Sequence, residues 1–206
     1  MALLAGDLKH DVIYSVPSLT AEFGFSATPI REAILDLAKE GLIVTVPNRG
    51  FRVVRDSSET IAQVAAVRKM LEVPATISAA TAITDDGFAD LMDLALAIKK
   101  FAVKKDLPNF FRKDQVFHER IMQATGNPML VQLTESLRAK ARLHALPTIV
   151  ASGKLVESAE EHIALLHAMQ EVDDRAVQRI VCFHIDYAGR ARDSAVEHDD
   201  VLVTTS

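Results

Sequence analysis

The chain has 206 residues, of which 49% are hydrophobic and 25% are charged, and its formal net charge is −5 at pH 7. This composition is typical of a globular protein with one large core, or one core and a smaller domain. Apolar runs fall well short of the roughly 20 residues that cross a bilayer, and the N-terminus lacks a signal-peptide pattern, so we expect no membrane partner. The single Cys182 excludes an intramolecular disulfide and favours a cytoplasmic location. Because the chain is acidic, binding to nucleic acid would require a local basic surface.

The first 55 residues predict two helices followed by a β-hairpin. A short helix is expected over residues 17–23, and a second begins at Thr28–Pro29 and ends at Gly41, because proline is tolerated at a helix start and glycine favours a helix end. The apolar residues of the second helix follow the spacing of an amphipathic helix and are Ile30, Ala33, Ile34, Leu37 and Ala38. Two apolar segments, 42–46 and 51–54, flank a turn at residues 47–50. This order of elements is the plan of a winged helix-turn-helix.

Local charge supports this interpretation. Residues 27–55 hold five basic and three acidic side chains, so their charge is +2 in a chain of net charge −5. Arg31 lies in the first turn of the second helix, the part of a recognition helix that meets base edges. Arg49 lies at the tip of the hairpin, where a wing can reach a phosphate or a minor groove. Together the two arginines predict a DNA-binding surface.

The motif from Ser26 to Ile34, with Glu40-Gly41-Leu42-Ile43 and Pro47-Asn48-Arg49-Gly50-Phe51-Arg52-Val53, resembles the DNA-binding domain of GntR-family transcriptional regulators. The resemblance implies that the DNA-binding residues are Ser26, Thr28, Arg31, Arg49 and Gly50. Two positions depart from the family pattern. Ala27 stands where the family usually has an arginine that contacts DNA, and only about five residues precede Gly6-Asp7-Leu8, so most of the family's first helix is expected to be missing. Either departure would weaken DNA binding.

The remaining residues, 56–206, predict an all-helical domain. Turn-forming residues separate six periodic segments, which run over 57–83, 86–104, 107–125, 128–146, 154–171 and 173–197. The fold class expected for the whole chain is therefore mainly α, with a winged helix-turn-helix followed by an antiparallel helical bundle.

Three of these helices carry polar groups inside their apolar faces. Asp114 and His118 are four residues apart, so they lie on one face of a helix, and burying a carboxylate without a partner is expensive. His162 and His184 lie on the apolar faces of two later helices. The apolar residues that share these faces are Phe110, Phe117, Ile121, Leu166, Met169, Ile180, Phe183 and Tyr187.

One carboxylate and three imidazoles are a plausible set of metal ligands. A lone histidine on an apolar face is more often a hydrogen-bonded core residue. Three such faces with an aspartate one turn away favour a site for a divalent transition metal, formed by Asp114, His118, His162 and His184. Zinc or nickel is expected, with manganese and iron left open.

The motifs Arg68-x-x-Leu71-Glu72, Asp114-x-x-Phe117-His118 and Glu161-His162, with His184, resemble the FCD ligand-binding domain of the FadR-type branch of the GntR family. The resemblance implies that the same four residues hold the metal, and that a small organic acid binds beside it. It also implies Arg68 and Asn127 as effector-binding residues. For Arg68 the alternative is an ion pair with Glu72 one helical turn away. Six helices would suggest the shorter, VanR-like version of the domain.

The sequence thus predicts a DNA-binding transcriptional regulator, a repressor, with a DNA-binding domain at 1–55 and a metal- and effector-binding domain at 56–206. It is expected to bind a palindromic double-stranded operator as a homodimer and to respond to a small carboxylate. Two alternatives remain open. One is a metal-dependent hydrolase or oxygenase, which the presence of the winged domain disfavours. The other is a ligand-binding protein whose DNA binding is weakened.

Overall fold

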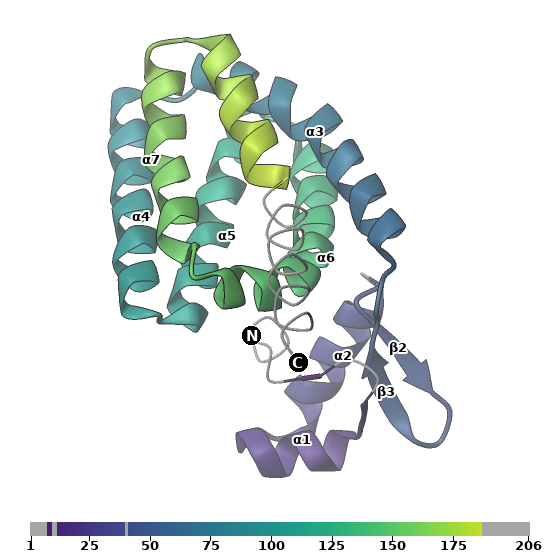
Figure 1. Cartoon of the computed structure of the whole chain (residues 1–206). Helices are drawn as coiled ribbons and strands as arrows, with labels where there is room; N and C mark the ends of the chain where they lie inside the picture. Colours follow the sequence, from purple (N-terminus) through teal and green to yellow (C-terminus); the bar gives the residue numbers. More distant parts are fainter. Residues whose placement is uncertain (1–7, 10–11, 40, 187–206) are drawn as a thin grey trace, which may run out of the picture.

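The computed structural model describes residues 8–9, 12–39 and 41–186 of the chain. A winged helix-turn-helix lies beneath a bundle of helices, and a short connection after β3 joins them (Figure 1). The winged part contains β1 (Ile13–Tyr14), α1 (Val16–Phe23), α2 (Ala27–Lys39), β2 (Ile43–Val46) and β3 (Gly50–Val53). The helical part contains α3 (Ser58–Ala80), α4 (Asp85–Lys104), α5 (Leu107–Gln123), α6 (Pro128–Ser152), α7 (Leu155–Gln170) and a further helix over residues 174–186.

The winged part is held by a small antiparallel sheet with the strand order β1-β3-β2. Its core contains Leu19 of α1, Leu42, Ile43, and Phe51 and Val53 of β3, all of them buried. The side chains of α2 that pack against this core are Ile30, Ile34, Leu37 and Ala38. Ala33, expected on the same face, is exposed.

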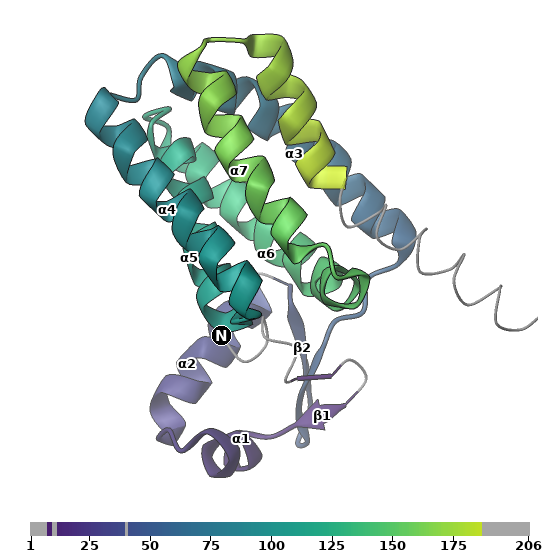
Figure 2. The same ribbon diagram turned by 60° about the vertical axis from the view of Figure 1, so that its left-hand side comes forward.

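The helical part encloses a second, larger core. α4, α5 and α7 pack side by side, while α3 and α6 pack against each other along the opposite side of the bundle (Figures 1 and 2). Phe117, Ile121, Leu166 and Met169 are at most 1% exposed, as their helical spacing predicts. The predicted class, a winged helix-turn-helix followed by an all-α bundle, is confirmed. Within the described residues, no helix is long and apolar enough to cross a membrane.

The structure differs from the sequence prediction at β1 and at the end of α6, and two further expectations concern residues that it does not describe. The sequence interpretation missed β1, whose two residues pair with Phe51 and Arg52. α6 continues through Pro147 to Ser152, because one proline removes a single helical hydrogen bond without necessarily ending the helix, as at Pro74 within α3. The expectation about the family's first helix concerns residues 1–7, which lie outside the described residues, as does Tyr187.

The buried face of the last helix also differs from the predicted one. Phe183 is 52% exposed, whereas Val177, Val181 and Ile185 are at most 5% exposed. The helix is therefore rotated relative to the expectation. His184 lies at the edge of the buried face, with its side chain 18% exposed.

Candidate metal centre

Three helices bring the four predicted ligands together. α5 supplies Asp114 and His118 one turn apart, α7 supplies His162, and the helix over 174–186 supplies His184. One potential ligand atom from each residue lies within 4.8 Å of the others. The packing of the three helices thus brings together the four side chains that the sequence pattern selected, although the last helix buries a different face from the predicted one.

The distances between these groups suit a small cation. His162 Nε2 lies 3.0 Å from Asp114 Oδ1 and 3.1 Å from His118 Nε2, and His118 Nε2 lies 3.5 Å from Asp114 Oδ1. Two ligand atoms bound to zinc at its usual distance of about 2.1 Å lie about 3.4 Å apart in a tetrahedron. The three imidazole rings form a nearly regular triangle, with centroids 4.9 to 5.1 Å apart.

Hydrogen bonds on the outer side of the cluster orient two of the imidazoles. His162 Nδ1 donates to the backbone carbonyl of Ser158 at 3.0 Å, so a neutral His162 presents the lone pair of Nε2 to the cluster. His184 Nδ1 donates to Glu161 Oε2 at 2.7 Å, with the same consequence for its own Nε2. In that neutral form, the Nε2 lone pair of His162 would face Asp114 Oδ1, which is also an acceptor. A cation bound between such groups would relieve their repulsion and use the outer hydrogen bonds typical of metal-binding histidines.

The protonation states also suit metal binding. Burial, together with the charge of Arg138, lowers the pKa of His118 well below its usual value. Burial also lowers the pKa of His184, although its hydrogen bond to Glu161 opposes this shift. Burial acts to raise the pKa of Asp114, but the neighbouring histidines and Arg142 outweigh it and hold the pKa well below its usual value. These pKa shifts favour a neutral imidazole at His118 and at His184 and a carboxylate at Asp114, the forms that bind metals.

α6 adds two arginines that the sequence interpretation missed. Arg142 Nη2 donates to Asp114 Oδ2 at 3.3 Å, on the carboxylate oxygen that faces away from the histidines. Arg138 Nη2 donates to Glu72, which is fully buried. No sequence signal identified these arginines, because basic residues on a helix are usually solvated. Glu161, which directly precedes His162, belongs to the motif that resembles the family, but the sequence pattern predicts no role for its carboxylate.

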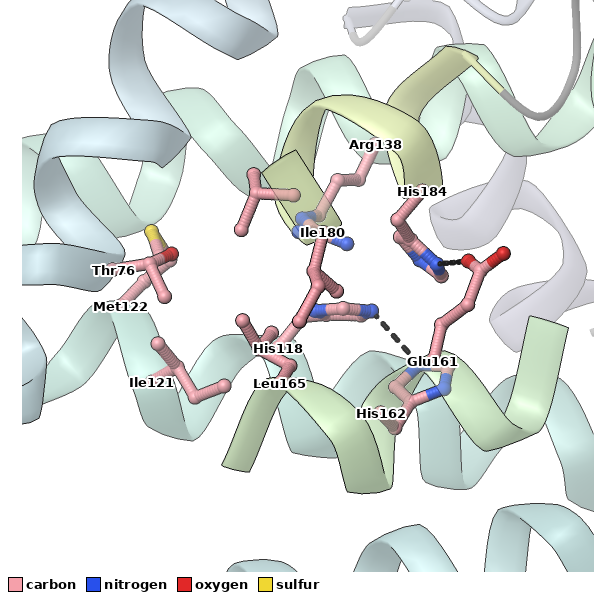
Figure 3. Close-up of a pocket in the computed structure, with 11 residues that line it drawn as sticks. Thr76, His118, Ile121, Met122, Arg138, Glu161, His162, Leu165, Ile180 and His184 are labelled. Carbon is pink, nitrogen blue, oxygen red and sulfur yellow. Dashed lines mark hydrogen bonds and ion pairs between the residues drawn. The ribbon is translucent and has the colours of Figure 1, made fainter. Parts of the chain in front are cut away.

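A small cavity adjoins the histidines (Figure 3). Its walls include the three histidines together with Thr76, Ile121, Met122, Arg138, Glu161, Leu165, Ile180 and Val181. The free space is about 10 Å³, enough for about one water molecule or one ion. Within the described part of the chain, Nε of Arg138 is buried and has no hydrogen-bond partner.

The two residues predicted to bind an effector, Arg68 and Asn127, do not line this cavity. Arg68 Nε donates to Glu72 Oε1 at 2.7 Å, which is the ion pair considered as the alternative, and Arg68 is not among the residues that line the cavity. Asn127 is exposed at the start of α6, where its Oδ1 accepts from the backbone N–H groups of Met129 and Leu130. Asn127 therefore caps a helix and lies outside the cavity.

The predicted DNA-binding residues lie at the start of α2 and at the tip of the wing. The exposed ones are Ser26, Thr28, Arg31 and Arg49. Gly50 begins β3 with φ 129°, and a Cβ at this position would lie 1.9 Å from the carbonyl oxygen of Tyr14. Glycine at this position therefore allows β1 and β3 to approach each other.

Comparison with known proteins connects this architecture to a family. The FCD domain family matches residues 63–187, more than half of the chain, and the family described as bacterial regulatory proteins, gntR family, matches residues 1–53. The solved structure titled E. coli McbR/YncC superposes with a TM-score of 0.76 at 22% identity, over 97% of this chain and 93% of the other, and shows the same fold.

Three curated relatives are named as regulators. The HTH-type transcriptional regulator McbR of Escherichia coli K12 is 26% identical over 83% of this chain and 78% of its own length. The HTH-type transcriptional repressor RspR of the same strain is 27% identical over 89% and 82%. The gluconate operon transcriptional repressor of Bacillus licheniformis is 29% identical over 67% and 56%. These relatives are regulators and not enzymes, and the chain therefore belongs to the GntR family of DNA-binding transcriptional regulators, with a C-terminal FCD domain.

Proposed function

We propose that this regulator is a repressor whose binding to DNA depends on a divalent transition metal and a small carboxylate in the helical domain. The observation that carries the metal assignment is the convergence of Asp114, His118, His162 and His184 within 4.8 Å. When bound, a zinc or nickel ion would supply a positive centre with an open position for a carboxylate oxygen. The proposed domains are the DNA-binding residues 1–55 and the metal- and effector-binding residues 56–206.

Metal content tests this proposal directly. Elemental mass spectrometry of protein purified without chelator should find close to one metal ion per chain, and its identity would separate zinc from nickel. His162→Ala should lose the metal, because His162 is 1% exposed and faces two other ligands. His167→Ala is the matched control, since His167 lies on the same helix but is exposed. Equal metal content in both variants, or no metal in the wild type, would refute the metal site.

For the carboxylate, Arg138 is better placed than Arg68. Arg138 lines the cavity beside the histidines, and its buried Nε is available to an acceptor (Figure 3). A ligand oxygen that accepted from Nε while binding the metal would satisfy this group, and hydrogen bonds between arginine and carboxylate are strong ones. The free space of about 10 Å³ suits an ion, so an organic acid requires the cavity side chains to move apart.

A panel of small acids tests this part of the proposal. Metal-loaded protein should gain thermal stability with at least one acid in a panel that runs from acetate to citrate and includes gluconate, because a ligand that binds the native state stabilises it. Arg138→Gln should weaken that gain, whereas Arg112→Gln, a change at an exposed position of α5, should not. A panel without any stabilising acid, or an unchanged response in Arg138→Gln, would contradict the assignment.

We further propose that Ser26, Thr28 and Arg31 contact bases or phosphates in the major groove, and that Arg49 and Gly50 present the wing to the backbone. A homodimer in the cytoplasm would match a palindromic operator. Selection of bound duplexes from a random pool should return a sequence with two-fold symmetry, and light scattering should give a dimer. Failure to enrich any sequence would favour the alternative of a ligand-binding protein with weakened DNA binding. That alternative is suggested by Ala27, which stands where the family usually has an arginine that contacts DNA.

A further inference from the structure

One face of α6 touches the candidate metal centre. Arg142 and Arg138 lie one helical turn apart, and Arg142 Nη2 contacts Asp114 Oδ2 at 3.3 Å. The side chains of Arg142 and Asp114 are both largely buried, 9% and 13% exposed respectively. The other oxygen of Asp114 is the one that faces His162 and His118. A single carboxylate therefore divides its two oxygens between the candidate metal position and α6.

The neighbouring face of the same helical turns touches the winged part. Leu143 is 5% exposed and belongs to the core formed by Leu42, Phe51 and the other buried residues of the winged part, and Ala139 packs against that core. Leu143 is the only residue of the helical part in this buried core, as far as the described residues go. Adjacent residues of α6, Arg142 and Leu143, thus contact the metal centre and the winged core respectively.

A third contact reinforces this connection. Lys140 Nζ lies 3.3 Å from Asp56, in the short segment that joins β3 to α3. The pair is partly buried, with side chains 28% and 11% exposed. A displacement of α6 would therefore act on the winged part both through its core and through the segment that connects it to the bundle.

We propose that Arg142 couples metal binding to the position of the winged part, with α6 as the connecting element. Once Asp114 Oδ1 ligates a cation, the carboxylate attracts Arg142 less strongly, and the guanidinium is repelled by the added positive charge. Arg142 then shifts away from Asp114 and carries with it the turn of α6 that holds Leu143. Metal binding and the winged part thus both affect the position of one helix, α6, as coupling between two sites requires. The proposal rests on the metal site of the proposed function, and it assigns the coupling to Arg142, Lys140 and Leu143.

Hydrogen exchange of the full chain, with and without Zn²⁺, tests this coupling without knowledge of the operator. Backbone amides of β2 and β3 should change their exchange rates about fivefold or more when zinc binds, which is the lower end of typical coupling. Arg142→Gln should still bind zinc, with equal or higher affinity because a competing positive charge is removed, but it should not transmit the change. Arg142→Lys keeps the charge and should retain part of the response. Leu143→Ala leaves every proposed ligand intact and should bind zinc normally, again without transmission.

Arg120→Gln is the matched control. It breaks an arginine–aspartate pair of similar length, 3.1 Å to Asp90, at the exposed surface of α5, and should respond to zinc as the wild type does. Unchanged exchange in β2 and β3 of zinc-loaded wild type, or full transmission in Arg142→Gln, would overturn the inference. A wild type that binds no zinc would refute the proposed function and this inference with it, whereas bound zinc without a change would refute the inference alone.

Discussion

Replacement of Glu72 by glutamine tests how the arginines beside the metal centre are held. Glu72 is 0% exposed and bonds to both Arg68 and Arg138, whose side chains are 8% and 12% exposed. Glutamine has nearly the same shape but no charge, so the variant leaves two guanidinium groups inside the bundle without their shared counterion. Removing one partner of a buried ion pair costs about 3–5 kcal/mol. Because domains are stable by only about 5–15 kcal/mol, the loss should be a large fraction of the free energy of unfolding.

The loss should also depend on pH. Burial acts to raise the pKa of Glu72, but the charges of Arg138 and Arg68 outweigh it and leave the pKa below its ordinary value of 4.5. A carboxylate whose pKa is lower in the folded state stabilises the fold above its unfolded pKa, and this contribution disappears as the pH falls through the folded pKa. The difference between wild type and Glu72→Gln should therefore be complete at pH 7 and shrink below pH 4.5.

Urea unfolding of the metal-free protein at a series of pH values measures both effects. Asp36→Asn is the control, because it breaks an ion pair with Lys39 at the surface, where the side chains of Asp36 and Lys39 are 66% and 76% exposed. This substitution should lower the free energy of unfolding by less than about 1 kcal/mol. A loss below about 1 kcal/mol for Glu72→Gln at pH 7, or a loss that is the same at pH 4 and pH 7, would refute the account of the buried pair.

Three further predictions follow from the site and the wing. Glu161→Gln should weaken metal binding by about 10- to 100-fold in a competition titration, because the carboxylate orients His184 through a 2.7 Å hydrogen bond; unaltered affinity would contradict that role. Gly50→Ala should lower the free energy of unfolding, measured by urea titration, by more than about 1 kcal/mol. The added Cβ would meet a backbone oxygen of β1, and the φ of 129° is itself unfavourable for alanine. Gly24→Ala, at φ 71° with open space around it, should cost less, and equal costs would exclude the close approach as the cause. Arg31→Ala should reduce DNA affinity in fluorescence anisotropy titrations. If Arg31 contacts a phosphate, the plot of log affinity against log salt concentration should become less steep, its slope decreasing in magnitude by about one. Unchanged affinity would show that Arg31 is not part of the DNA interface.

The order of elements and the candidate ligands could be predicted from the sequence, because both depend on local periodicity. An apolar stripe with a 3.6-residue period reveals a helix and its buried face, and a polar residue inside that stripe must find a partner. Asp114, His118 and His162 were identified in this way. The same reasoning was less reliable where the signal is weak. It chose Phe183 for the buried face of the last helix, and it ended α6 before Pro147.

The sequence by itself therefore determined which helices form and which of their polar groups must be satisfied inside the bundle. The tertiary structure decided which groups satisfy them. Arg138 reaches Glu72 across 66 residues of sequence, and Arg142 reaches Asp114 across 28. A charged residue on α6 carries no local mark of burial, because its desolvation is compensated only when another helix supplies the opposite charge. For the same reason, only the packed structure could place Leu143 in the core of the winged part, next to an arginine that touches the candidate metal centre.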